Sequence, residues 1–467
     1  MRTVHLIGGV AAIALALGGA TLAQSQAAPQ PQPRPQALQT QTPQAATSPS
    51  VRPVPTRMPI PVSAIFPNTQ ALFDGYVQQQ KMPGIVGAFG HGDGPTFFVT
   101  AGRIGLEPGA PAADADSIWR VYSMTKPITA MAAMLLVEDG KLGLDDPLSK
   151  YFPAFAKMKV LKDPDTSLET VPATRPITIR ELMTHSSGLG YQINAKGPLL
   201  KEYERLGLVP FAANGETEAT ARRTRPTSLA VFAERVAQAP LIAQPGTTWH
   251  YSMGLDVLAA VIEKASGEKF ETFLRRRLLD PLKMTSTDWQ VAPGDVGRFA
   301  TNYAFAGDRL VPMDPARTSV FLQPPSFPYG GAGLTSSASD YDRFLHMLQD
   351  EGTLDGVRVM KPETVRLAMS NLLPPGVTFG GIGKGTGGDM SAKMGFGAGG
   401  SVYLADMPGG PSKGTYGWGG AAGTIAFVDP GKRFRGTIMV NYFPGDRWPV
   451  REETVKALAA DAARLGR

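Results

Sequence analysis

The stretch that most constrains the fold is a run of ten residues, 128–137, that is apolar except at Thr129. A helix without a polar face has to be buried on every side. Pro127 directly precedes the run, and because proline has no backbone N–H it is tolerated only in the first turn of a helix. The sequence therefore predicts a central, fully buried helix that begins within one turn of Pro127.

Two polar residues stand at the start of this helix, Ser123 and Lys126. Three residues make about one helical turn, so both side chains lie on the same face. An ammonium held against apolar surface loses hydration, which favours the neutral amine and allows it to take a proton from a serine hydroxyl. The spacing alone is equally compatible with a capping serine and a solvated lysine. A second copy, Ser266 to Lys269, has Gly267 beside its serine and is typical of a polar break between helices.

The N-terminal region predicts export. A short, weakly basic head precedes an apolar run, 6–22, that is rich in small residues and contains four glycines. This pattern indicates a secretory signal peptide at 1–23, cleaved after Ala23 or Ala27, and the run is too short and broken for a membrane span. We expect a periplasmic or secreted protein without stable membrane insertion. It has no cysteine, so its fold contains no disulfide.

Residues 24–58 are rich in Gln, Pro, Ala, Thr and Ser and contain no acidic residue. Such a segment cannot bury enough apolar surface to fold, so we expect a disordered tether. Residues 1–58 hold four arginines and no acidic residue, so the remainder carries only +2 of the whole-chain net charge of +6. The basic composition is therefore no argument for a nucleic-acid partner.

Strand patterns occur near both ends of the remaining chain, 59–467, and helical patterns dominate its middle. Helices are predicted at 69–80 and 449–465. The predicted strands are 85–89, 96–100, 401–404, 424–428 and 437–442. We expect an α+β fold in which 59–127 and 331–467 build one antiparallel sheet flanked by helices, with a mainly helical domain, 128–330, inserted between them.

Three further motifs follow the helix in order: GKLGLDDPL at 140–148, ITIRELMTHSSGL at 177–189 and PGTTWHYS at 245–252. Together with Ser123 and Lys126 they resemble the superfamily of class C β-lactamases and penicillin-binding proteins, over about residues 70 to 460. The resemblance implies a β-lactamase-like fold and a reaction that passes through an acyl-enzyme on Ser123. It also implies that Tyr251 is the tyrosine of the second catalytic motif, which exchanges a proton with the serine and with the leaving group.

Two positions depart from the β-lactamase pattern. Met253 stands where the motif Tyr-x-Asn has its amide, and Trp418-Gly419-Gly420 stands where β-lactamases have Lys-Thr-Gly. The second feature is similar to family VIII carboxylesterases. Without the lysine, the site lacks the cation that would bind a β-lactam carboxylate, so neutral esters are favoured.

The resemblance also implies the remaining site residues. The backbone N–H groups of Ser123 and Ala421 would form the oxyanion hole. Tyr329 belongs to a block that the superfamily shows at a pocket edge, although a plain turn explains this block equally well. The predicted substrate-binding residues are Met253, Trp418, Gly419, Gly420 and Tyr329.

Histidine chemistry is not favoured, because the five histidines are dispersed and His5 lies in the predicted signal. His91 falls in a turn, His346 in a predicted surface helix, and His185 and His250 in the motifs described above. A Ser-His-Asp triad and a zinc site both need such residues to converge. We therefore expect no metal and no cofactor.

The predicted function is hydrolysis of a small-molecule carboxylic ester through an acyl-enzyme on Ser123, with Lys126 and Tyr251 as proton carriers. One alternative is a β-lactamase or D,D-peptidase that acts on β-lactams or cell-wall peptides, which Met253 and Trp418 oppose. The other is a catalytically silent binding protein, which the intact catalytic set opposes.

Overall fold

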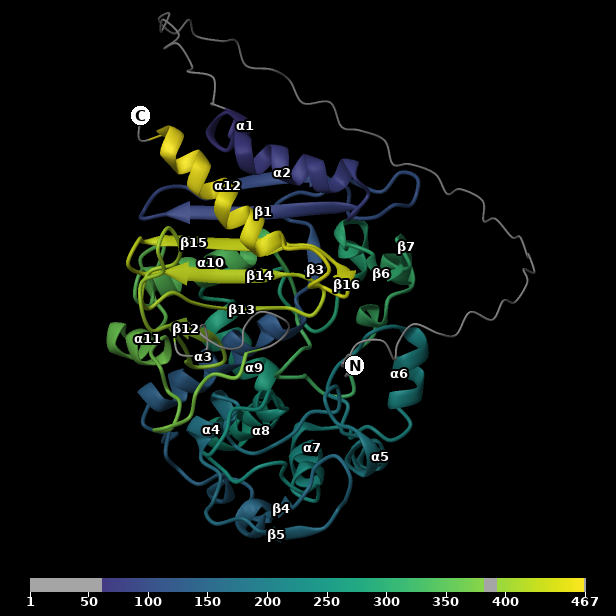
Figure 1. Ribbon diagram of the computed structural model, residues 1–467, viewed down its shortest axis with the longest axis vertical. Helices are drawn as coiled ribbons and strands as arrows, with labels where there is room; N and C mark the ends of the chain where they lie inside the picture. The colour runs from purple at the N-terminus through teal and green to yellow at the C-terminus, as the bar shows by residue number, and fades with distance from the viewer. Residues whose placement is uncertain (1–60, 382–392, 466–467) are drawn as a thin grey trace, which may run out of the picture.

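The computed structural model describes residues 61–381 and 393–465 (Figure 1). The predicted signal peptide and tether lie outside the described residues. In the described part of the chain no helix is both long and apolar enough to cross a membrane.

One seven-stranded antiparallel sheet is built from both ends of the chain, as predicted (Figure 1). The two ends meet where β1 pairs with β15, from Val86 opposite Met439 to His91 opposite Phe434. The order of strands across the sheet is β11 (Met394–Phe396), β12 (Ser401–Tyr403), β13 (Tyr416–Gly419), β14 (Ile425–Asp429), β15 (Phe434–Met439), β1 (Gly84–His91) and β2 (Phe97–Gly102).

Helices cover both faces of the sheet. On one face lie α2 (Pro67–Gln78) and α12 (Val450–Leu465), the two terminal helices that the sequence predicts, preceded by the short α1 (Val62–Ile65). Asp461 of α12 accepts hydrogen bonds from the backbone N–H groups of Asn68 and Thr69 at 2.8 and 3.0 Å, so α12 caps the start of α2. On the other face α10 (Ala338–Gln349) packs against the central strands.

The buried helix α3 (Thr125–Glu138) lies between this sheet and the helical region. Every residue from Thr125 to Leu136 is buried, and Pro127 lies in the first turn, which confirms the prediction. Gly140 ends the helix with φ of +69°, a conformation that glycine adopts without strain. α3 packs along α8 (Gly254–Ser266), a helix of the inserted region.

The inserted region is mainly helical, as expected, but it also contains strands. Its remaining helices are α4 (Ile179–Met183), α5 (Gly197–Leu206), α6 (Gly215–Ala221), α7 (Leu229–Val236) and α9 (Phe270–Leu274). Two small hairpins interrupt them, β4 (Lys159–Leu161) with β5 (Thr170–Pro172) and β6 (Asn302–Ala306) with β7 (Arg309–Asp314). β6 also pairs with β16 (Tyr442–Phe443), so this part of the insert attaches to the C-terminal half.

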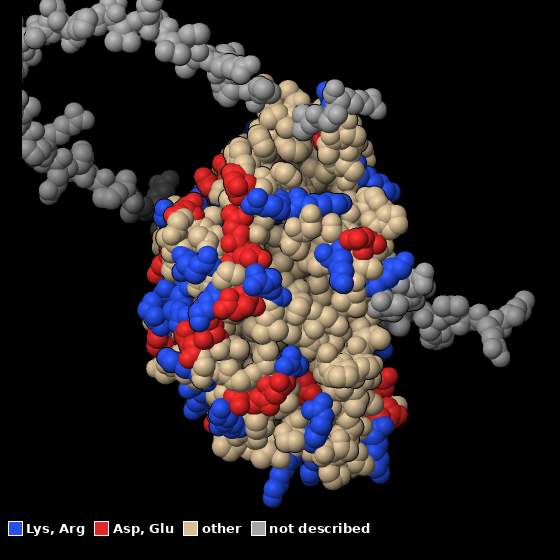
Figure 2. Space-filling view, turned by 90° about the vertical axis from the view of Figure 1, so that its left-hand side faces the viewer, with Lys and Arg blue, Asp and Glu red and all other residues tan. Residues whose placement is uncertain are grey.

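Two further strand pairs and one α-helix remain to be described. β3 (Ile118–Arg120) pairs with β8 (Thr335–Ser337) and leads into the segment that carries Ser123. β9 (Thr353–Leu354) and β10 (Val357–Arg358) form a short hairpin before α11 (Pro362–Ala368). On the face that Figure 2 shows, basic and acidic side chains are interspersed, and no extended basic patch forms there.

Candidate active site

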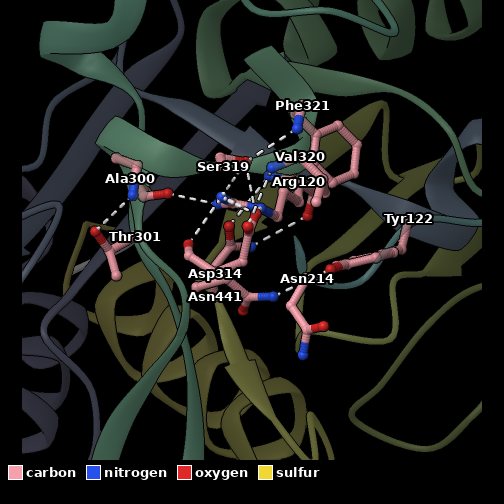
Figure 3. Close-up of polar contacts among 12 residues, drawn as sticks. Arg120, Tyr122, Asn214, Ala300, Thr301, Asp314, Ser319, Val320, Phe321 and Asn441 are labelled. Carbon is pink, nitrogen blue, oxygen red and sulfur yellow. Dashed lines mark hydrogen bonds and ion pairs between the residues drawn. The ribbon is translucent and has the colours of Figure 1, made fainter. Parts of the chain in front are cut away.

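A buried charge network fixes the strand that leads to Ser123 (Figure 3). Arg120, at the end of β3, is fully buried and forms an ion pair with Asp314, whose carboxylate accepts from Nε at 2.9 Å and from Nη2 at 2.6 Å. The guanidinium also donates to the Ala300 carbonyl and to Ser319 Oγ. The backbone of Arg120 exchanges two hydrogen bonds with the Asn441 side chain. The start of the nucleophile segment is therefore held from several sides.

Tyr122, directly before Ser123, has a strained backbone with φ of +41°, a conformation that favours glycine. Its side chain is buried, and its hydroxyl accepts a hydrogen bond from Asn302 Nδ2 at 3.0 Å. Burial raises the pKa of this phenol above its usual value, so it stays protonated. Ser123 follows in a single 3₁₀ turn, Tyr122–Met124, that leads into α3.

The structure brings Ser123, Lys126 and Tyr251 together. Tyr251 Oη lies 2.6 Å from Ser123 Oγ, and Lys126 Nζ lies 3.3 Å from the same oxygen. Lys126 Nζ is also 4.6 Å from the centre of the Tyr251 ring. Ser123 is half-buried, whereas Lys126 is fully buried. Of the two residues only Ser123 is partly exposed, as a nucleophile has to be.

The shorter hydrogen bond of Lys126 is to a group that the sequence did not predict. Nζ donates to the carbonyl of Gly331 at 2.7 Å. A Cβ at Gly331 would lie 2.5 Å from Asp256 Oδ2, and one at Gly330 would lie 2.4 Å from the Leu255 carbonyl. The two glycines are therefore required for this segment to lie against α8, and they are the sequence signal that could have found the contact.

Asp256 lies behind this segment and is fully buried. Its Oδ1 accepts from the Gly331 N–H at 2.8 Å, and its Oδ2 has no hydrogen-bond partner among the described residues. Burial raises the pKa of Asp256 to about 7, and the positive charge of Lys126 opposes this shift. Nothing in the local sequence distinguished this aspartate from an ordinary residue in the first turn of a helix.

Two predicted substrate-binding residues do not reach an open surface. Tyr329 is 1% exposed, and its hydroxyl accepts from Arg225 Nη1 at 2.6 Å. Met253 is also 1% exposed and lies in the main core, where its N–H donates to the Gly190 carbonyl at 3.1 Å. The contact of these two side chains with substrate remains a prediction, and the structure shows both of them packed in the main core.

β13 places Trp418 beside Tyr251. The indole is half-buried, and its ring centre lies 6.0 Å from that of Tyr251 and 5.0 Å from that of Phe396. A Cβ at Gly420 would lie 2.4 Å from the Val121 carbonyl, so glycine is needed for the end of β13 to approach the Ser123 segment. Gly419 is partly exposed and Ala421 is exposed on the same edge.

His185 contacts the tyrosine but not the serine. Its ring centre lies 4.7 Å from that of Tyr251, and its Nδ1 accepts from the Ser252 N–H at 3.1 Å. Burial and the charge of Lys126 lower its pKa well below the usual value, so the ring is neutral. In 61–381 and 393–465 no histidine bonds to Ser123, and no three His, Cys, Asp or Glu residues converge as a metal site would need.

The chain contains one Gly-x-Ser-x-Gly pattern, from Gly410 to Gly414, which in other hydrolases marks a nucleophile between a strand and a helix. Here it connects two strands, β12 and β13. The N–H of Ser412 donates to Asp429 Oδ2 at 3.0 Å, as in an ordinary turn. The position of Ser412 in a turn between two strands does not favour it as an alternative nucleophile.

A cavity of about 660 Å³ lies away from these residues. Its polar lining includes Glu218, Arg222 and Arg225, and its wall is completed by Val320 and the segment 323–326. Glu218 accepts from both arginines, so one of the two positive charges is left uncompensated within this lining. None of the predicted site residues lines this cavity.

Comparison with known proteins gives consistent matches. The family model "Beta-lactamase" matches residues 69–461. Esterase EstB of Burkholderia gladioli is 30% identical over 312 residues, which cover 63% of this chain and 73% of EstB. Lovastatin esterase of Penicillium rubens is 30% identical over 339 residues, which cover 67% of this chain and 77% of that protein.

Among solved structures, the chain is similar to EstCE1, described as a hydrolase with promiscuous acyltransferase activity. The TM-score is 0.68 at 24% identity, and the match covers 85% of this chain and 99% of EstCE1. At this identity the likeness concerns the fold, which agrees with the predicted β-lactamase-like architecture.

Proposed function

The chain belongs to the beta-lactamase family, and on that premise we propose that it is a serine esterase that cleaves neutral carboxylic esters through an acyl-enzyme on Ser123. The observation that carries the proposal is the position of Ser123 Oγ, within hydrogen-bonding reach of Tyr251 Oη at 2.6 Å and of Lys126 Nζ at 3.3 Å. The neutral Lys126 amine or the Tyr251 phenolate can accept the hydroxyl proton as the oxygen attacks a carbonyl carbon.

The proposed reaction uses the chain's own groups at each step. Ser123 Oγ bonds to the ester carbonyl carbon while its proton passes to the Lys126 and Tyr251 pair. The N–H groups of Ser123 and Ala421 stabilise the negative oxygen that forms. Tyr251 then protonates the departing alcohol. Water attacks the acyl-enzyme by the same route and releases the acid.

The proposed preference for neutral esters depends on Trp418. Its half-buried indole lies beside Tyr251 and offers apolar surface to an acyl or alcohol group. Each methylene buried there gains about 0.8 kcal/mol. A carboxylate at the same place would lose hydration without a matching cation. This argument opposes the alternative of a β-lactamase or D,D-peptidase, and the adjacent Ser123, Lys126 and Tyr251 oppose a silent binding protein.

We also propose that the protein is exported, on the composition of residues 1–23. The proposed substrate is a small-molecule ester, in line with the printed name of the relative lovastatin esterase.

The test is to incubate the purified protein with p-nitrophenyl butyrate, a chromogenic cephalosporin and a fluorophosphonate probe. We expect turnover of the butyrate, little turnover of the cephalosporin and labelling of Ser123. Ser123→Ala should lose activity by at least about a thousandfold. Ser412→Ala is the matched control and should retain it. Turnover that survives Ser123→Ala, or a preference for the cephalosporin, would refute the proposal.

A further inference from the structure

Among residues 61–381 and 393–465, the buried amine of Lys126 has no ionic partner in direct contact. Its two polar contacts in the described chain, the Gly331 carbonyl at 2.7 Å and Ser123 Oγ at 3.3 Å, are neutral groups. A fully buried ammonium without a counter-charge is strongly unfavourable. An acidic group close behind these contacts is therefore needed if the amine is to be protonated in the resting protein.

Asp256 meets this requirement by geometry. Gly331 lies between the two side chains, because its N–H donates to Asp256 Oδ1 at 2.8 Å and its carbonyl accepts from Lys126 Nζ. Asp256 Oδ2 would be 2.5 Å from a Cβ at Gly331, so the carboxylate occupies the space that glycine leaves. The same oxygen has no hydrogen-bond partner in the described chain. A carboxylate with one free buried oxygen is poorly explained by a purely structural role.

Among the described side chains that face Asp256, Lys126 is the one that can carry a positive charge. Lys126 comes from α3, and Tyr191 comes from the segment before α5. Burial, together with the charge of Asp256, holds the pKa of Tyr191 well above its usual value, so this phenol is neutral. Thr129 of α3 donates to the Gly330 carbonyl and carries no charge.

We propose that Asp256 is a positioning residue that acts through Lys126: its carboxylate is the counter-charge of the buried ammonium and sets the pH above which Lys126 can accept the proton of Ser123. This inference rests on the proposed function, because it assigns Lys126 the role of base. Each group exchanges its proton with water, so no direct transfer between them is needed. Removing the negative charge makes the neutral amine more favourable and moves the active pH range downward.

The test is the rate at which a fluorophosphonate labels Ser123 between pH 5 and 9. In Asp256→Asn the midpoint of the acidic limb should fall by about one pH unit. One unit below the wild-type midpoint, the variant should then label about fivefold faster. Asp256→Ser, which is also neutral and keeps an oxygen for the Gly331 N–H, should show the same shift. The matched control is Asp340→Asn, because Asp340 is a buried carboxyl whose burial raises its pKa and whose partners are Thr287 and Ser286.

An unchanged midpoint with slower labelling, or a midpoint that moves upward, would overturn the proposal. A second measurement does not require the Asp256 variants to fold. In Lys126→Met the Asp256 carboxyl, followed by carbon NMR, should titrate at a higher pH than in the wild type, because the coupling is reciprocal. An unchanged titration would also overturn the inference. If wild-type Ser123 is not labelled at all, the proposed function fails, while the titration of Asp256 still reports on the inference.

Discussion

Replacing Arg120 with Met should destabilise the protein strongly, because it leaves a buried carboxylate without its partner. The side chains of Arg120 and Asp314 are 0% and 2% exposed, and they are joined by a contact of 2.6 Å. The guanidinium also stacks on Phe299, with 4.1 Å from its carbon to the ring centre. Methionine can keep part of this packing but none of the hydrogen bonds.

The expected loss can be worked out from the burial. Removing one partner of a buried ion pair costs about 3–5 kcal/mol, against a total stability of about 5–15 kcal/mol for a typical protein. The variant should therefore remain folded at 25 °C with a clearly lower urea midpoint. The proposed esterase activity should fall as well, because Arg120 lies three residues before Ser123 and anchors the strained segment between them.

The assay is urea unfolding at pH 7 with the same substitution at an exposed pair as control. Arg276 and Glu268 are 53% and 32% exposed at the side chain, so Arg276→Met should cost no more than about 1 kcal/mol. The double variant Arg120→Met with Asp314→Leu should recover part of the loss, since no unpaired charge remains. If Arg120→Met and Arg276→Met differ by less than about 1 kcal/mol, the reasoning about the network is wrong.

Four further outcomes are expected. Lys126→Ala should abolish labelling of Ser123 while the protein stays folded, and Lys126→Arg should not restore it, because arginine stays protonated; an active arginine variant would mean that another group removes the serine proton. Trp418→Lys should raise the ratio of cephalosporin to butyrate turnover by about tenfold through a new charge-assisted contact, and an unchanged ratio would show that Trp418 does not face the substrate. Burial raises the pKa of Asp256 to about 7, so its charge destabilises the folded state increasingly from pH 4 to 7. The stability of Asp256→Asn relative to wild type should therefore rise over that window by up to about 4 kcal/mol in urea unfolding, and a flat difference would contradict the shift. A chain that begins near Arg57 should keep its ester turnover and its melting temperature within a few degrees, as the composition of 24–58 predicts; a larger drop would show that the removed segment docks on the body.

Local patterns predicted the elements that depend on neighbouring residues. The apolar run after Pro127 has no polar face, so burial of α3 follows from the sequence alone. Ser123 and Lys126 share a face because they lie three positions apart where the 3₁₀ turn at Tyr122–Met124 leads into α3. The strands at both ends were visible as short apolar runs.

The remaining parts of the site depend on contacts between distant segments. Tyr251 lies 128 residues from Ser123, and Gly331 lies 205 residues from Lys126. A family motif predicts Tyr251, but no local pattern predicts the Gly331 carbonyl or Asp256. Met253 and Tyr329, which the family resemblance places at the substrate, are both 1% exposed.

The difference has a physical reason. Helical, extended and buried segments could be predicted from the sequence, because backbone preference and the spacing of apolar residues act over a few neighbouring positions. The groups that surround the Lys126 amine could not, because α3, α8 and the Gly330–Gly331 segment acquire their mutual positions by packing. The charge state of Asp256 arises from that packing, since an aspartate in the first turn of a helix is ordinary in water and becomes a much weaker acid only when it is buried.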